Sequence, residues 1–132
     1  MRPHDAERLQ KLLQALAAGR DPGRLLDDAV QAAVAACGGR GGLIAGNIDG
    51  KLTPLASAGA VPSAVFEAAE RAMATNAMSR QSDAASGAHA IAEPLRVNGA
   101  VIGAMAVGGE MKAMDATPLV VFAAAASLVL PR

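Results

Sequence analysis

The amino-acid sequence predicts an α+β domain with a central antiparallel sheet of five to six strands and helices on both faces. Two pairs of apolar, extended segments are each joined by a tight-turn dipeptide, Asp49-Gly50 and Asn98-Gly99. The second pair is apolar on nearly every residue, as is typical of strands that are covered on both faces. Segments with the three- and four-residue spacing of buried helix positions precede, separate and follow the two pairs. These observations place two hairpins at the centre of one helix-covered sheet.

The N-terminal segment predicts two helices in succession. The first covers Asp5–Ala18 and has one apolar stripe, formed by Leu9, Leu12, Leu13 and Leu16. Gly19 suits the left-handed residue that ends a helix. The second helix then begins with Asp21 as N-cap and Pro22 in the first turn. The glycine-rich residues 38–42 end it.

The first hairpin is predicted from residues 43–48 and 51–58, which flank the first turn dipeptide. Pro54 lies inside the second strand and has no N–H to donate, so this strand is expected at an edge of the sheet. The glycines at 38–42 lead from a helix into a strand, whereas a phosphate-binding loop leads from a strand into a helix. A phosphate loop is therefore excluded there.

The middle of the chain predicts a helix, a loop and the second hairpin. Residues 61–80 have helical spacing, and Ser63 is the expected N-cap. The next ten residues, QSDAASGAHA, are small and polar and indicate a surface loop of the kind that often edges a pocket. The second hairpin comprises residues 89–97 and 100–107.

The final helix begins at Asp115 or Thr117, ends at Leu130 and is apolar on every side. Such a helix is normally buried all round. We therefore expect its outer side to be covered by the first two helices or by a second protomer, and we favour the second protomer. The apolar stretch from Pro118 to Leu130 has only 13 residues, well short of the roughly 20 that cross a bilayer. No membrane partner is expected.

Composition narrows the classes of function further. The length suits one domain, residues 1–132, with residues 1–19 as a lead helix available for dimerisation and residues 20–132 as the domain body. Twelve basic and twelve acidic residues balance, so nucleic acid is not an expected partner. The single cysteine, Cys37, excludes an internal disulfide and a multi-cysteine metal centre, and is expected to be a small buried hydrophobic residue. The charged N-terminus does not resemble a secretory signal, so a cytoplasmic protein is expected.

The order of elements carries a resemblance to a known family. A lead helix is followed by PGRLLDDAVQAAVAACGGRGGLIAGNIDGKLTPLASAG, by a helix that opens at VPSAVF, and by AIAEPLRVNGAVIGAMAV. The last stretch contains Pro94-Leu95 and Val101-Ile102-Gly103. Over nearly the whole chain this arrangement resembles a GAF domain, either stand-alone or excised from a larger sensory protein. Roadblock-type domains share a similar profilin-like sheet but normally begin with one helix.

The resemblance implies a non-enzymatic regulatory module without a cofactor or metal. It implies a pocket for a small molecule between the sheet, the middle helix and the loop. It also implies terminal helices that build a parallel homodimer and pass a signal to an effector protein. The alternative is a degenerate GAF scaffold that serves only dimerisation or docking of a partner protein.

The chemically marked subgroups of the family do not fit this sequence. The Asn-Lys-Phe-Asp-Glu signature of cyclic-nucleotide phosphodiesterase GAF domains is absent. Cys37 lies in the wrong half of the chain for a bilin ligand. The free methionine sulfoxide reductases rely on several cysteines, and one sulfur cannot both attack and resolve through an internal disulfide.

Four polar residues are the candidates for ligand binding: Asn47, Arg80, His89 and Glu93. His89 and Glu93 lie four apart on a predicted strand and so face the same side, as a base with a carboxylate, as two metal ligands, or as solvated groups. Asn47 either points into the pocket or bonds the local backbone. Arg80 either pairs with a ligand carboxylate or phosphate or belongs to an ordinary loop. The dimer interface is predicted at Leu9, Leu13, Leu16, Val121 and Leu128. No catalytic residue is predicted.

Overall fold

Helices and strands follow one another in the predicted order, with one additional strand. The computed structural model describes residues 3–83, 87–110 and 114–130. Their elements are α1 (Pro3–Ala17), α2 (Pro22–Cys37), β1 (Gly41–Ile48), β2 (Lys51–Gly59), α3 (Ser63–Thr75), β3 (Ser79–Asp83), β4 (Ala88–Val97), β5 (Ala100–Gly109) and α4 (Thr117–Ser127). Among these described residues, no helix is both long enough and apolar enough to span a membrane.

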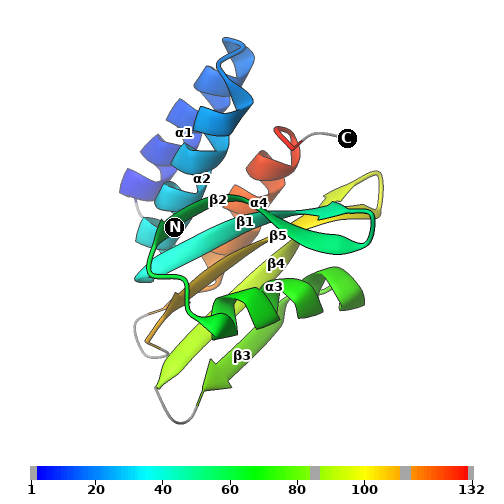
Figure 1. The fold of residues 1–132 in the computed structure, drawn as a ribbon. Coiled ribbons are helices and arrows are strands. Elements are labelled where there is room, and N and C mark those ends of the chain that lie inside the picture. Colours follow the sequence, from blue (N-terminus) through cyan, green and yellow to red (C-terminus); the bar gives the residue numbers. More distant parts are fainter. Residues whose placement is uncertain (1–2, 84–86, 111–113, 131–132) are drawn as a thin grey trace.

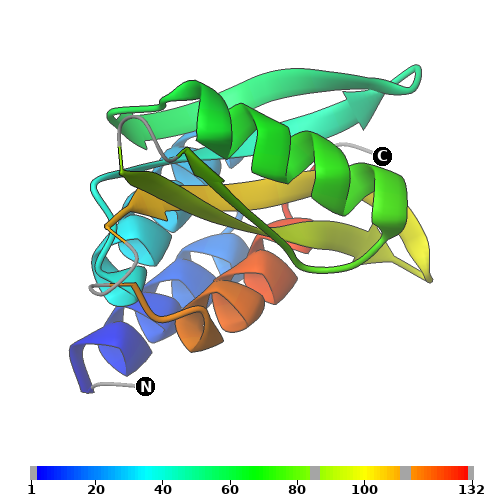
Figure 2. The same ribbon diagram turned by 90° about the horizontal axis from the view of Figure 1, so that it is seen from below.

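A single antiparallel sheet with the order β2-β1-β5-β4-β3 forms the centre of the molecule. One face carries α3, and the other carries α1, α2 and α4 (Figure 1, Figure 2). β4 is buried without interruption from His89 to Leu95, because helices cover it from both sides. The predicted α+β architecture, with five strands in the described residues, is therefore confirmed.

Both predicted hairpin turns are present. Asp49 and Gly50 have φ angles of 54° and 78°, and Asn98 and Gly99 have φ angles of 52° and 81°. Two successive positive φ angles are the mark of a type I′ turn, whose twist matches that of the flanking strands. The turn dipeptides therefore fix the register of each hairpin.

β2 is an edge strand, as Pro54 predicts. Ile44 pairs with Ala56 and Ala45 pairs with Pro54, so Leu55 is an additional residue on β2 and forms a bulge. Pro54 sits beside this bulge, where the missing N–H interrupts the ladder least.

The sequence prediction for residues 61–80 is wrong at both ends. α3 begins at Ser63, its N-cap is Pro62, and no side chain caps it, so Ser63 is not the N-cap. The helix ends at Thr75 because Asn76 adopts the left-handed conformation, with φ 52°. Residues 79–83 form strand β3 instead of helix and loop. β3 pairs with β4 through its backbone at the edge of the sheet, so it needs no alternation of apolar side chains.

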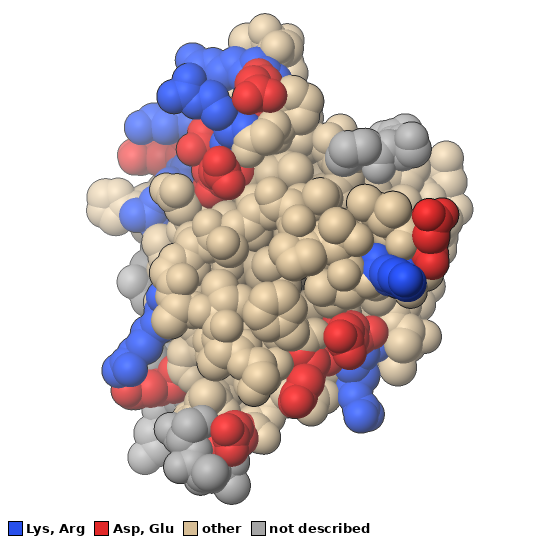
Figure 3. All heavy atoms as spheres, viewed as in Figure 1, with Lys and Arg blue, Asp and Glu red and all other residues tan. Residues whose placement is uncertain are grey.

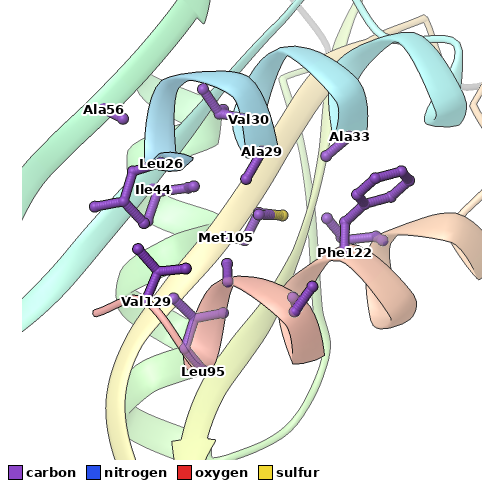
Figure 4. Close-up of a cluster of buried hydrophobic side chains, with 14 of the residues drawn as sticks. Leu26, Ala29, Val30, Ala33, Ile44, Ala56, Leu95, Met105, Phe122 and Val129 are labelled. Atoms are coloured by element: carbon purple, nitrogen blue, oxygen red, sulfur yellow. The ribbon is translucent and has the colours of Figure 1, made fainter. Parts of the chain in front are cut away.

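Two buried clusters of different composition lie on the two faces of the sheet. The cluster between α3 and the sheet, here called the alanine layer, contains Leu43 and Val65 and is otherwise made of Ala45, Ala64, Ala68, Ala69, Ala72, Ala90, Ala92, Ala104 and Ala106. The cluster on the opposite face, here called the large-residue layer, includes Leu26, Ile44, Leu95, Met105, Phe122 and Val129 (Figure 4). Consecutive residues of one strand supply opposite layers, as Ala104 and Met105 do.

α4 is covered on its inner side and exposed along one stripe. It packs on β4 and against α2 and α1, so the first two helices cover part of its outer side. Val120 and Leu128 remain 47% and 56% exposed, and Ala124 lies exposed between them at helical spacing. No second protomer is needed to bury most of this helix.

Candidate functional site: a cleft at one end of the sheet

The candidate site is a cleft of about 670 Å³ at the N-terminal end of α3, called here the terminal cleft. Four separate segments form it: the residue before β1, the connection between β2 and α3, the start of β4, and the end of β5. Its lining consists of Arg40, Ala60, Val61, Pro62, Gly87, Ala88, Gly108, Gly109 and Glu110. The volume lies in the range of small-ligand sites, which is about 300–1,000 Å³.

An ion pair lies at the rim of the terminal cleft. Arg40 Nη2 donates to Glu110 Oε1 at 2.5 Å. The two side chains are 73% and 64% exposed, so water screens much of their attraction. The Arg40 backbone is held more firmly, because its N–H donates to the Gly108 carbonyl at 2.8 Å. The guanidinium therefore projects from a fixed backbone position.

Close backbone packing explains the glycines near this end of the sheet. A Cβ on Gly41 would lie 1.8 Å from the Ala60 carbonyl oxygen. A Cβ on Gly59 would lie 2.2 Å from the Arg40 carbonyl oxygen, and Gly59 also has a positive φ of 62°. Glycine lets the start of β1 and the end of β2 touch, and this contact places Arg40 beside the connection that leads into α3.

The space beneath the centre of α3 is filled. Ala68, Ala69 and Ala72 of the helix have 0% exposure, as do Ala92 and Ala104 of the sheet. In the described residues, the alanine layer therefore occupies the place between sheet and middle helix where the family resemblance implies a pocket. The terminal cleft lies beyond the end of this layer.

Asn47 lies on the same face as the terminal cleft but at the other end of α3. Its side chain Nδ2 donates to the Val101 carbonyl at 3.4 Å. It borders a second cleft, of about 590 Å³, together with Lys51, Glu70 and Met73. The sequence left two interpretations of Asn47, a pocket residue or a residue bonded to the backbone. In the structure Asn47 bonds a backbone carbonyl and also lies on the wall of this second cleft.

His89 and Glu93 lie on the opposite face of the sheet, on the side of the large-residue layer with Ile91 between them. Four residues of extended strand separate them by about 13 Å, so the two side chains do not converge. His89 is buried, and its Nδ1 has no partner in the described residues. Burial, and then the positive charge of Arg80, lowers the pKa of His89 below its usual value. The neutral imidazole is therefore favoured.

Glu93 belongs to a bonded network around an arginine that the sequence analysis missed. Arg96 Nη1 lies 3.3 Å from Glu93 Oε1. The same guanidinium donates to the Asn76 carbonyl at 2.9 Å and to the Asn76 side-chain oxygen. Arg96 thus binds the residue that ends α3 and a carboxylate on the other face of the sheet. Glu93 and Arg96 border a groove of about 450 Å³ beside α4.

Arg80 is exposed on β3, directly opposite Ile91. It does not border the terminal cleft. The four residues predicted for ligand binding are therefore distributed over both faces of the sheet, and the structure does not bring all four together.

Cys37 is a buried thiol at the end of α2. Burial, followed by the negative charges of Asp115 and Asp5, raises its pKa to about 12. A thiol with this pKa is protonated at neutral pH and is a poor nucleophile. Among the residues that the structure describes, no three His, Cys, Asp or Glu side chains are grouped as metal ligands would be.

The predicted dimer residues lie on the face of the sheet that carries α1, α2 and α4, and they differ in exposure. Leu13 is 41% exposed and Leu128 is 56% exposed. Leu9, Leu16 and Val121 are half-buried, and Leu9 and Leu16 pack against the large-residue layer.

Arg40 and Glu110 were also missed from sequence, because 70 positions separate them. The signal that finds them is strand pairing: β1 pairs with β5 so that Gly41 faces Gly108. The residue before β1 and the residue after β5 must then be neighbours.

In the view of Figure 3, charged side chains gather over the α1–α2 pair and around the margins, and much of the surface between them is uncharged.

Comparison with known proteins finds solved structures that have a similar fold. No protein-family model matches the sequence, and neither does any curated protein. Among solved structures, the GAF domain of an Acinetobacter phosphoenolpyruvate-protein phosphotransferase is similar with a TM-score of 0.74 and 15% identity, covering 98% of this chain and 93% of that chain. The second GAF domain of DevS from Mycobacterium smegmatis has a TM-score of 0.61 and 25% identity, covering 82% and 91%.

An enzyme shares the same architecture. The free methionine-R-sulfoxide reductase from Neisseria meningitidis is similar with a TM-score of 0.68 and 16% identity, covering 95% of this chain and 85% of that chain. Fold alone therefore does not separate a regulatory domain from an enzyme. The helices, the strand order and these likenesses agree that the chain has the GAF-domain fold.

Proposed function

We propose that this chain is a regulatory domain that binds a small molecule in the terminal cleft. The observation that carries the proposal is the cleft itself, with its volume of about 670 Å³ and its mainly apolar lining around one rim ion pair. Small-ligand sites are typically concave, apolar and equipped with a few polar groups that orient the ligand. The likeness to GAF domains of a phosphoenolpyruvate-protein phosphotransferase and of DevS supports the regulatory class.

The described residues favour binding over catalysis at this site. The thiol of Cys37 is buried and protonated at neutral pH. His89 lies on the side of the large-residue layer and does not border the terminal cleft. The carboxylate described at the cleft, Glu110, is exposed and paired with Arg40 at the rim, whereas nucleophilic or acid–base catalysis needs a group within about 3 Å of the reacting atoms.

A thermal-shift screen tests the proposal. A ligand that binds the folded state raises the Tm by mass action. We expect at least one member of a library of small organic acids, amino acids and nucleotides to raise the Tm of the wild type but not that of Ala60→Leu, whose larger side chain fills the cleft. Ala17→Leu, at an exposed position of α1, is the matched control and keeps the response. An equal response in all three proteins would place the ligand elsewhere, and no response in the wild type would reject ligand binding.

A second candidate function is a dimerising or docking scaffold that uses α1 and α4. The specific observation in its favour concerns three of the four exposed large hydrophobic residues among those described: Leu13 lies on α1, Val120 lies on α4, and Leu128 is the C-cap of α4. In this proposal two copies bury the exposed stripe of Val120, Ala124 and Leu128 against each other. They transmit a signal to an effector through α1 and α4.

Light scattering tests the scaffold function. We expect the wild type to have twice the mass of one chain and the variant Leu128→Lys to dissociate, because a lysine placed in an apolar interface is costly to bury. Ile48→Lys is the matched control, since Ile48 is the fourth exposed large hydrophobic residue, at 51%, but lies at the β1–β2 turn. A wild type that is monomeric at all concentrations would reject this function.

A further inference from the structure

We propose that the terminal cleft selects small molecules that combine an apolar body with a carboxylate, with Arg40 as the binding residue and Glu110 as its exchangeable counter-ion. This inference rests on the proposed ligand-binding function and adds the chemical class of the ligand.

The charged side chains among the described residues of the cleft form one pair. Among the described lining residues only Arg40 and Glu110 are charged, and the remaining seven are alanine, glycine, valine or proline. An apolar body can contact this wall without leaving a buried polar side chain unsatisfied. The charge of the preferred ligand therefore depends on whether the ligand binds Arg40 or Glu110.

The guanidinium is the better equipped member. Arg40 contacts Glu110 through Nη2, and no side-chain contact of its Nε or Nη1 is present among the described residues. A guanidinium carries five N–H donors in a planar fork that matches a carboxylate in two parallel bonds. Such paired, charge-assisted bonds are stronger and more directional than the contact of a carboxylate with an ammonium ion.

Glu110 is easily exchanged. The ion pair is more than half exposed on both sides, and exposed pairs contribute little to folding. A ligand carboxylate whose body lies on the apolar wall can therefore join or replace Glu110 at the guanidinium at little cost. The Arg40 backbone stays in place during this exchange, because Gly108 and the close contact with Gly59 hold it.

Two charge-removing substitutions separate this role from a structural one. Arg40→Gln and Glu110→Gln both break the same ion pair, so a purely structural role predicts that they change ligand affinity in the same direction. Carboxylate binding predicts opposite directions. Arg40→Gln removes the binding fork, whereas Glu110→Gln removes the competing carboxylate.

The experiment measures the affinity of the full chain for pentanoate, pentanamide and pentylamine by calorimetry, in the wild type and both variants. These probes share an apolar body and differ in the charge of the head group. We expect pentanoate to bind tightest, Arg40→Gln to weaken it about tenfold, and Glu110→Gln to tighten it about threefold. We expect pentanamide to respond to neither substitution by more than about twofold, because it carries no charge.

The opposite outcomes overturn the inference in distinguishable ways. Preference for pentylamine, with weakening in Glu110→Gln, would assign the ligand to Glu110 and would leave the proposed ligand-binding function intact. A change in the same direction in both variants would make the pair structural. Failure of pentanoate to bind also overturns the carboxylate class. The proposed function itself then stands or falls on the broader library and the Ala60→Leu variant.

Discussion

The two faces of the sheet are packed by different means. Beneath α3 the contact is mostly alanine against alanine, whereas beneath α2 and α4 alanines are interleaved with leucine, isoleucine, valine, methionine and phenylalanine. Small side chains bring a helix close to the sheet and leave little free volume, because protein interiors are packed to nearly the density of organic crystals. In the described residues, α3 therefore leaves no room for a ligand beneath its centre, and the terminal cleft lies at its N-terminal end.

The largest expected effect comes from truncating the large-residue layer. Phe122 is completely buried, so Phe122→Ala removes a whole ring and leaves a cavity. We expect the free energy of unfolding to fall by about 4 kcal/mol, measured by urea denaturation followed by circular dichroism. Val120→Ala, on the exposed stripe of the same helix, is the control and should lower it by less than about 1 kcal/mol. Equal effects would show that α4 does not pack on the sheet as described.

Enlarging the alanine layer tests the opposite limit. Ala69 has 0% exposure between α3 and the sheet, so Ala69→Leu inserts three carbons where no space exists. We expect a loss of about 3 kcal/mol of unfolding free energy by the same measurement, because overpacking forces strain on the backbone. Ala74→Leu, at an exposed position of the same helix, should be nearly neutral. A stable Ala69→Leu protein would mean that α3 can move away from the sheet and open a pocket beneath it.

A moderate effect is expected where the two faces are linked. Arg96 contacts Asn76 at the end of α3 and Glu93 on the opposite face. Arg96→Gln removes these contacts at a partly exposed site, and we expect a loss of about 1 kcal/mol of unfolding free energy. Arg71→Gln on the exposed side of α3 serves for comparison and should have no measurable effect. Hydrogen exchange of the last turn of α3 should accelerate in Arg96→Gln alone; unchanged exchange would contradict the link.

The smallest expected effect is a pH dependence on the face of the large-residue layer. Burial, and then Arg80, lowers the pKa of His89 in the folded protein, so the unfolded chain binds a proton more readily. The stabilising contribution of the neutral imidazole is then complete above the unfolded pKa of about 6.5 and is lost as the pH falls below it. Unfolding free energies of the wild type and His89→Gln, measured between about pH 5 and pH 8, should converge toward the acid end. Parallel curves would show that His89 does not titrate differently in the two states.

Local sequence signals predicted the elements that local chemistry determines. The type I′ turn requires two successive positive φ angles, which few dipeptides adopt readily. Asp49-Gly50 and Asn98-Gly99 adopt them, so these dipeptides located both hairpins. Pro54 located the edge strand because a missing donor is tolerated there. The nearly continuous apolar character of the second hairpin indicated that both faces of the sheet are covered, and the uninterrupted burial of residues 89–95 agrees.

Features that depend on distant pairing could not be predicted in the same way. β3 is polar, and only its backbone pairing with β4 makes it a strand. Arg40 and Glu110 become neighbours only through the register of β1 on β5. Asn47, Arg80, His89 and Glu93 were chosen for their chemistry, but the alternation of strand residues places them on different faces of the sheet.

The bulge at Leu55 and the neighbouring Pro54 also affect how this chain behaves at high concentration. β2 has one unpaired edge, and such an edge is a template on which a foreign strand can add and from which fibrils grow. The proline offers no donor, and the extra residue bends the strand away from the flat geometry that continuous addition needs. A protein this rich in alanine and valine is thereby protected against strand addition at the β2 edge.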